Sequence, residues 1–346
     1  METIIFIGSI NLGGVADDGE TMKNRMLLGA LNKHNVGKIH KIDTRNRPKR
    51  ILYVLKYIIL LLLIRRKKII FSASSFVTYK LIKIARLLCV NPNNIYYWVI
   101  GGKFADYVEE HRIDKSIYTN IKKIFVVGES MKQKLNSLGF ANVDVFPNFK
   151  NITYIPKRDD KKDSVVRFVF LSRIIPQTGV DIIIDAVKQL NKEFSDDFIV
   201  DFYGKIDPSY ESTFLSAIEN GHNINYQGFL NLTEKSGYDT LATYDVMLFP
   251  TFWEGEGFPG IIIDAYIAGL PIIASDWNLN SQIIKDGVTG NIIPPMNTDA
   301  LVNTMLKYIT REINIVTISN FTQNEATFYH IDNVITTPFL RSIGLL

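Results

Sequence analysis

The chain has 346 residues, a length typical of two domains of roughly 150–170 residues each rather than of one core. Its hydrophobic content of 47% can fill such cores, and its single cysteine, Cys89, excludes an internal disulfide and favours a reducing compartment. The net charge of +4 hides an asymmetry. Residues 1–160 carry 27 Lys and Arg against 13 Asp and Glu (+14), whereas residues 161–346 carry 12 against 22 (−10). We therefore expect the first half to meet an anionic partner.

The first half alternates short apolar runs with helical patterns. Its N-terminus, METIIFIG, is typical of a strand and lacks the features of a signal peptide, so we expect the chain to stay where it is made. Helices are predicted at Glu20–His34 and Ser130–Leu138. The predicted strands are Ile4–Ile7, Lys38–Ile42, Lys68–Ala73, Asn94–Val99, Lys123–Val127 and Val143–Phe146. This alternation predicts a parallel sheet wrapped by helices.

The most apolar run is Ile51–Ile64, which has 14 residues and includes Lys56. It is too short to cross a bilayer, which takes about 20 residues. Basic residues flank it on both sides: Arg45, Arg47, Lys49 and Arg50 before it, and Arg65, Arg66, Lys67 and Lys68 after it. An apolar helix with basic ends favours contact with an anionic membrane surface. The alternative is a buried helix whose charged ends are merely solvated.

The pattern breaks at Pro147–Ser164, which holds two prolines and a run of charges. We predict an N-terminal domain at 1–155, a linker at 156–164, and a C-terminal domain at 165–320. A helical segment, 321–346, is expected to pack back on the first domain. The C-terminal domain has predicted strands at Val166–Ser172, Phe198–Tyr203, Asp245–Pro250, Pro271–Ser275 and Val288–Ile292, and predicted helices at Val180–Phe194, Glu211–Glu219, Pro259–Ala268 and Thr298–Thr310. Two Rossmann-like domains of the α/β class are expected to face a cleft, with ligands at the carboxyl ends of the strands.

A G-x-G-x-x-G pattern at Gly255, Gly257 and Gly260 resembles a dinucleotide-binding fingerprint and raises the alternative of an NAD(P)-dependent oxidoreductase. In that fingerprint the first glycine follows the strand at once, but here four residues separate it from the predicted strand end. Glu256, inside the pattern, would repel a pyrophosphate by about 1 kcal/mol or more. The context therefore favours other chemistry, with the oxidoreductase as a remote alternative.

Two carboxylates give this stretch a better explanation. Pro259 suits the first position of a helix and Gly269 its C-cap, which leaves Glu256 in the loop before it. Asp264 lies about 7–8 Å past Pro259 along the helix axis. Both carboxylates, Glu256 and Asp264, can therefore face one pocket and accept hydrogen bonds from sugar hydroxyls. Burying Asp264 unpaired would be costly, so we expect it to face solvent or ligand.

Four stretches resemble one family in the right order. EGEGFPGIIIDAYIAGLPIIASD is similar to the signature of the family 4 retaining glycosyltransferases, with Asp264 in place of its second glutamate. Three further stretches resemble segments of the same family. They are VVGESMKQKLNSLGFANVDVFPNF before the linker, FLSRIIPQTGVDIIIDA at the start of the donor domain, and DGVTGNIIPP after the signature. The resemblance covers most of the chain and implies the GT-B fold, in which the C-terminal domain holds a nucleotide-sugar.

The resemblance also implies roles for residues. Arg173 is expected to neutralise the donor diphosphate, and Glu256 to hold sugar hydroxyls or to lie near the reacting carbon. Asp264 is expected to bind the ribose. The remaining donor contacts implied are the glycine loop after the first strand and the start of the signature helix: Gly13, Gly14, Gly257, Phe258, Pro259 and Gly260.

The chain departs from the family at several places. Thr178 stands where a lysine would be expected as a second diphosphate partner, so the phosphates are held by Arg173 with helix amides or by a lysine from elsewhere. Gln282 replaces a glutamate after the signature. Gly101 and Gly102 stand where many members carry a histidine at a strand end.

The sequence contains no D-x-D, no phosphate-binding P-loop and no metal-ligand spacing among its five histidines, so no metal and no cofactor are expected. No nucleic-acid motif accompanies the basic half. We predict a retaining glycosyltransferase that moves a sugar from a nucleotide-sugar to a glycan acceptor, expected to be lipid-linked, in bacterial surface polysaccharide synthesis. It would be cytoplasmic and peripheral on the inner membrane face through Arg65, Arg66, Lys67 and Lys68. The alternative is a non-catalytic or phosphorylase-like sugar-nucleotide binder.

Overall fold

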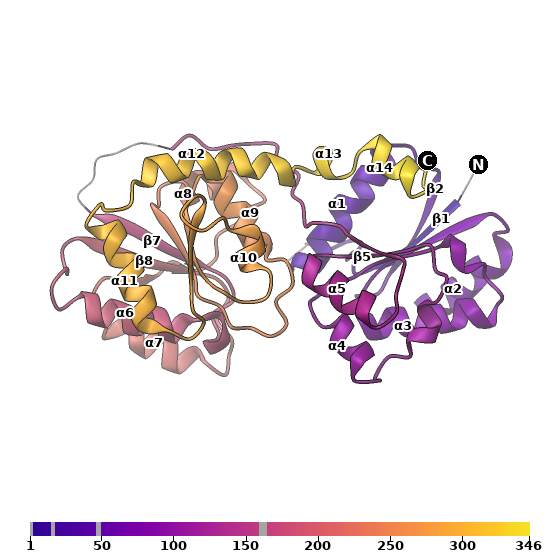
Figure 1. The fold of residues 1–346 in the computed structure, drawn as a ribbon, viewed down its shortest axis with the longest axis horizontal. Coiled ribbons are helices and arrows are strands. Elements are labelled where there is room, and N and C mark those ends of the chain that lie inside the picture. The colour runs from indigo at the N-terminus through magenta and orange to yellow at the C-terminus, as the bar shows by residue number, and fades with distance from the viewer. Residues whose placement is uncertain (1–2, 15–17, 46–49, 159–164) are drawn as a thin grey trace. The chain divides into compact units, whose positions relative to one another are not determined.

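The computed structural model describes residues 3–14, 18–45, 50–158 and 165–346. The chain forms two compact units (Figure 1). The first unit comprises Met1–Asn151, Gly255–Phe258 and His330–Leu346, and the second comprises Ile152–Glu254 and Pro259–Tyr329. The end of the predicted linker, residues 159–164, lies outside the described residues.

The first unit is built on a parallel six-stranded sheet with the order β2-β1-β3-β4-β5-β6. Its strands are β1 (Thr3–Gly8), β2 (Lys38–Asp43), β3 (Lys67–Ser72), β4 (Ile95–Trp98), β5 (Lys123–Val126) and β6 (Val143–Val145). Its helices are α1 (Gly19–Lys33), α2 (Arg50–Leu63), α3 (Ser75–Leu87), α4 (Phe104–Glu109), α5 (Glu129–Ser137), α13 (Ile331–Val334) and α14 (Thr337–Ser342), with short 3-10 turns at Pro92–Asn94 and Lys115–Tyr118. The predicted strands of this half are confirmed.

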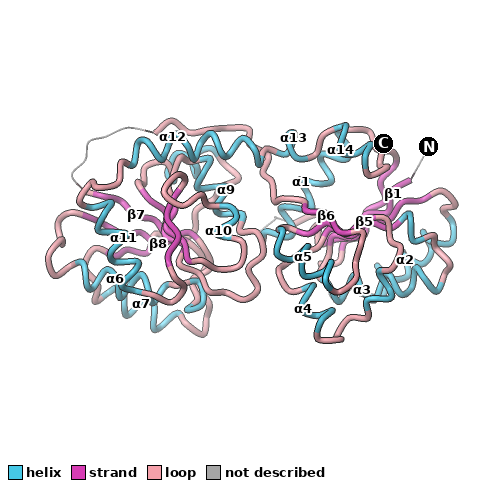
Figure 2. The backbone as a smooth tube through the Cα atoms, viewed as in Figure 1, coloured by secondary structure: helices cyan, strands magenta, loops and turns pink. Residues whose placement is uncertain are grey.

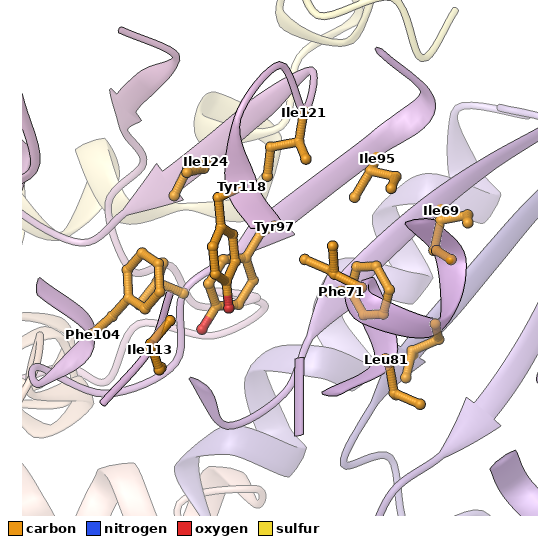
Figure 3. Packing of buried hydrophobic residues seen from close by; sticks show 14 of the residues in the cluster. Ile69, Phe71, Leu81, Ile95, Tyr97, Phe104, Ile113, Tyr118, Ile121 and Ile124 are labelled. Carbon is orange, nitrogen blue, oxygen red and sulfur yellow. The ribbon is translucent and has the colours of Figure 1, made fainter. Parts of the chain in front are cut away.

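Helices cover both faces of this sheet, so its strands are apolar on both sides (Figure 2). In β3, Ile69 and Phe71 enter one core while Ile70 enters the core on the opposite face. The first of these cores is rich in rings: Tyr97 lies edge-on to Phe104 at 5.2 Å between ring centroids (Figure 3). On the other face, the closing segment His330–Leu346 packs beside α1, where Lys33 pairs with Asp332 at 2.7 Å.

The second unit has a parallel sheet with the order β12-β11-β10-β7-β8-β9. Its strands are β7 (Val166–Leu171), β8 (Phe198–Tyr203), β9 (Ile224–Tyr226), β10 (Val246–Phe249), β11 (Ile272–Ser275) and β12 (Gly290–Ile293). Its helices are α6 (Val180–Leu190), α7 (Glu211–Glu219), α8 (Lys235–Leu241), α9 (Gly260–Ile267), α10 (Asn280–Ile283), α11 (Thr298–Ile309) and α12 (Ile315–Ala326), with 3-10 turns at Pro176–Thr178 and Thr327–Tyr329.

This unit differs from the sequence prediction in several features. The helices α8 and α10 were not predicted, and α12 begins at Ile315, before the predicted helical segment 321–346. Strand β9 was not predicted, because it has only three residues and its sequence, INY, is too short to show a period. Pro259 is the N-cap of α9 rather than its first residue, and Ala268 is the C-cap, with Gly269 following at φ 71°. Among the described residues, no helix combines the length and the apolar character needed to span a bilayer.

Candidate functional site

Arg173 lies just after β7, at the carboxyl edge of the second unit's sheet, and its side chain is exposed. The guanidinium carbon stands 5.1 Å from the centroid of the Trp253 ring, a cation–π arrangement that orients the cation. Thr178, at the position of the family lysine, is buried, and its hydroxyl donates at 2.8 Å to the carbonyls of Arg173 and Ile175. Thr178 therefore shapes the loop that carries Arg173.

A second cation lies at the same edge. Lys205 follows β8, the neighbour of β7, and its carbonyl accepts the backbone N–H of Ile174 at 3.0 Å. Its side chain is exposed. Asp207 lies close by, and its pKa is lowered first by hydrogen bonds from Ser209 and also by the charge of Arg173. Sequence reasoning missed Lys205, although a lysine just after a strand of a parallel sheet is a signal that could have found it.

The segment Thr251–Trp253, which leads from β10 to the signature, is held by hydrogen bonds to two neighbouring segments. The N–H of Phe252 donates to the carbonyl of Gln177 at 2.8 Å, which joins it to the loop after β7. On the other side, the Ser275 hydroxyl donates to the Thr251 carbonyl, and the Trp277 indole donates to the Trp253 carbonyl at 2.9 Å. These bonds hold Trp253 beneath the guanidinium and fix the point where the glycine loop begins.

Helix α9 carries Asp264, which was expected to face solvent or ligand. It does not face solvent, because the residue is only 4% exposed, and its contact with a ligand stays a prediction. Burial is tolerated because the Tyr238 hydroxyl of α8 donates to its Oδ1 at 2.6 Å. Burial and the charge of Asp264 raise the pKa of Tyr238, so the phenol stays protonated as the donor. Tyr238 is the second residue that sequence reasoning missed.

The signature loop Gly255–Phe258 belongs to the first unit. A Cβ added to Gly102 would lie 2.6 Å from the backbone carbonyl oxygen of Glu256, so only glycine allows this approach. The Asn148 amide donates to the Phe258 carbonyl at 3.1 Å. The glycine in place of the family histidine therefore makes room for the loop. That Glu256, half-buried, and Asp264 face one pocket stays a prediction.

The glycine loop after β1 is held from two sides. Asp43 accepts the N–H groups of Ile10 at 3.0 Å and Leu12 at 2.8 Å, and these bonds lower its pKa against the opposing effect of burial. Arg25 donates to the carbonyls of Ile10 and Gly14 at 2.8 and 2.6 Å. Gly13 has φ 98°, and no described residue apart from its two chain neighbours comes within 4 Å of the place where its Cβ would stand, a geometry suited to close approach of a ligand.

The predicted membrane-facing cations differ in their contacts. Arg65 and Arg66 are exposed. Lys67 donates to the carbonyls of Leu61 and Ile64, the latter at 2.6 Å, and so caps the carboxyl end of α2. Lys68 is half-buried. Arg47 and Lys49 lie outside the described residues.

Gln282, in place of the family glutamate, is exposed on α10. No group of three or more His, Cys, Asp or Glu side chains that could hold a metal ion occurs within the described part of the chain. The second unit thus carries exposed cations at the carboxyl edge of its sheet and the carboxylate of Asp264, and the first unit carries Glu256 in the signature loop. Cations suit the recognition of phosphates, and carboxylates suit that of sugar hydroxyls.

Parts of the chain are similar in sequence to known proteins. The family described as "Glycosyl transferases group 1" matches residues 152–324. The chain is similar to the capsular polysaccharide biosynthesis glycosyltransferase CapH of Staphylococcus aureus, with 31% identity over 38% of this chain and 36% of CapH. It is also similar to a phosphatidyl-myo-inositol mannosyltransferase of Mycobacterium leprae, with 24% identity over 56% of this chain and 51% of that protein. The matched stretches thus span about a third to a half of these relatives.

Among solved structures, Anabaena HepE in complex with UDP-glucose is similar over 100% of both chains, with a TM-score of 0.70 and 15% identity. A likeness at this identity concerns the fold. Together with the two parallel sheets, it confirms the predicted fold class: α/β of the GT-B type, with two Rossmann-like domains.

Proposed function

Because the chain belongs to the glycosyl transferases group 1 family, we propose that it is a retaining glycosyltransferase that moves a sugar from a nucleotide-sugar to a hydroxyl of a glycan acceptor. The observation that carries the proposal lies within the matched residues. Arg173, stacked on Trp253, stands exposed at the carboxyl edge of the second sheet, where ligands of parallel α/β domains bind. A guanidinium at that place suits a diphosphate.

Each part of the donor has a partner in the proposed site. Arg173 and Lys205, on neighbouring loops, neutralise the diphosphate, so Lys205 supplies the charge that Thr178 does not. Asp264, held by Tyr238, accepts hydrogen bonds from the ribose hydroxyls.

The signature loop and the glycine loop complete the donor contacts. Glu256 and the amides of Gly257 and Phe258 hold the sugar, while Pro259 is the N-cap of α9, whose first-turn N–H groups, from Gly260 on, favour an anion. Gly13 and Gly14 bring a backbone without side chains against the phosphates.

In the proposed reaction the bond between the anomeric carbon and the diphosphate oxygen breaks, and the acceptor oxygen bonds to that carbon on the same face. The departing diphosphate takes the acceptor proton, so no separate base is needed. Arg173 and Lys205 stabilise the charge that develops on the leaving group. The alternative is a covalent intermediate, for which Glu256 is the candidate nucleophile.

The acceptor is proposed to be a lipid-linked glycan, in the synthesis of a surface polysaccharide on the inner face of the plasma membrane. Two observations support this: the +14 charge of residues 1–160, and the similarity to CapH, named for capsular polysaccharide biosynthesis. The reaction is proposed to need neither a metal nor a cofactor.

A thermal-shift screen against nucleotide-sugars and NAD(P) tests the donor site, with Arg173→Ala and Glu256→Ala alongside. One nucleotide-sugar is expected to raise the melting temperature, and both variants to lose the effect. A shift with NAD(P) alone would overturn the proposal. Turnover with the stabilising donor, followed by NMR of the product anomer, distinguishes a retaining transferase from a non-catalytic or phosphorylase-like binder.

A further inference from the structure

The helix α2 presents an apolar face that the described residues of the first unit leave exposed. Its six exposed large side chains are Ile51 at 75%, Leu52 at 61%, Leu55 at 50%, Ile59 at 53%, Leu62 at 65% and Leu63 at 74%. At 3.6 residues per turn they fall within an arc of about 120°. On the opposite side, Tyr57 and Leu61 are buried in the core with Tyr53, Val54 and Leu60 packed around them. A helix that is apolar all round is normally buried in a core or in lipid. In α2 one apolar face is buried in the core, and the other apolar face is exposed.

The stretch of sequence around this face carries many basic residues and no acidic ones. Residues 44–105 contain 13 Lys and Arg and no Asp or Glu. Arg65 and Arg66, just beyond the end of α2, are exposed. Helix α3 packs beside α2, with the Tyr57 hydroxyl donating to the Leu81 carbonyl at 3.2 Å, and presents the exposed Lys80 and Lys83.

We propose that this face of α2 inserts into the interfacial layer of an anionic bilayer, with the helix lying parallel to the surface. The proposal rests on the membrane placement given above and deepens it: apolar insertion holds the protein, and the cations steer it. At 14 residues α2 is about 21 Å long, shorter than a hydrocarbon core of about 30 Å. A second copy of the chain is a poorer occupant, because it would bring two segments of the same strong positive charge together.

The structure also separates the roles of the flanking cations. Arg65 and Arg66 contact the lipid headgroups, whereas Lys67 is committed to the carbonyls of Leu61 and Ile64. Lys56, at the border of the apolar arc, donates to the Lys41 carbonyl at 2.8 Å. Removal of a charge at Arg65 or Arg66 should therefore weaken vesicle binding about fivefold per residue, while the structure of α2 is kept.

The test is flotation of the full chain with vesicles of phosphatidylcholine containing phosphatidylglycerol, against phosphatidylcholine alone. We expect binding to the anionic vesicles, lowered at least tenfold in a variant with Ile51→Gln, Leu55→Gln, Ile59→Gln and Leu62→Gln. Glutamine is a good helix former, and circular dichroism confirms that the fold is kept. Val316→Gln with Phe321→Gln, on α12, is the matched control because these side chains are 48% and 49% exposed.

Each other result counts against the proposal. The proposal would be overturned if the four-glutamine variant bound vesicles as well as the wild type does. It would also be overturned if salt abolished vesicle binding completely, because apolar insertion should leave a part of the binding that salt does not remove. A lipid-free dimer of the wild type that this variant dissociates would overturn it too, since a second copy would then cover the face. The donor-dependent thermal shift of the variant is measured in parallel. If neither the wild type nor any variant shows a donor-dependent thermal shift, the proposed function is refuted, and the result on membrane binding still stands.

Discussion

The helices α2 and α9 have nearly the same apolar composition but opposite surroundings. In α9, five of the eight side chains are apolar and at most 1% exposed, because α8 and α12 pack around the helix. In α2, six large apolar side chains are at least half exposed. Each helix has a polar residue in its interior: Asp264 is buried and paired with Tyr238, while Lys56 stays at the surface. Apolar content thus predicts a helix in both places, but neighbouring elements decide whether it becomes a core or a surface.

The largest effect expected lies inside α2 itself, between two adjacent leucines. Leu61 is 4% exposed and Leu62 is 65% exposed. Leu61→Ala should lower the free energy of unfolding by about 2–5 kcal/mol, because it leaves a cavity in the core. Leu62→Ala should change it by no more than about 0.5 kcal/mol. Urea unfolding of both variants measures the difference, and equal losses would show that the outer face of α2 is covered in solution.

In α9 the comparison depends on the buried carboxylate. Asp264→Ala leaves the buried Tyr238 hydroxyl without this acceptor, so the free energy of unfolding should fall by about 1–3 kcal/mol. Donor affinity should fall as well. Asp299→Ala, an exposed aspartate of α11, is the control. Tyr238→Phe should cost at least as much stability as Asp264→Ala, because it takes a hydrogen-bond donor from a buried carboxylate. A donor shift that survives Asp264→Ala would remove this residue from the proposed site.

A cation of the second unit extends the comparison from stability to ligand binding. Lys205 faces solvent beside the Arg173 loop, so Lys205→Met should leave stability unchanged. It should weaken the binding of the nucleotide-sugar about tenfold, or about 1.4 kcal/mol, with partial rescue by Lys205→Arg. Isothermal calorimetry measures both. Lys192→Met, on the exposed surface after α6, serves as the control, and an effect equal to that of Lys205→Met would point to general charge rather than to a site.

The smallest effect is expected where α2 ends. Lys67→Met removes the cation that bonds the last carbonyls of the helix, and should lower the free energy of unfolding by about 1 kcal/mol. Arg66→Met should leave stability unchanged and weaken vesicle binding. If thermal unfolding and flotation gave the reverse assignment, Lys67 would be the lipid contact.

Much of the architecture could be predicted because it depends on local sequence. The apolar run Ile4–Ile7 became β1, since a strand buried on both faces needs continuous apolar residues. The spacing of Glu256, Pro259 and Asp264 likewise predicted a loop followed by a helix. The strand β9 could not be predicted, because its three residues form a strand only by pairing with β8.

By itself, the sequence determined the order of the elements, the two α/β units, and the signature with its carboxylates and Arg173, since each is written in residues close together along the chain. Tertiary structure alone decided the partners. Tyr238 and Asp264 are 26 positions apart, and the loops that carry Arg173 and Lys205 lie side by side because β7 and β8 are neighbours in the sheet. It also decided that Lys67 caps a helix and that one face of α2 stays uncovered. Periodicity shows that a face is apolar, but only packing shows what covers it.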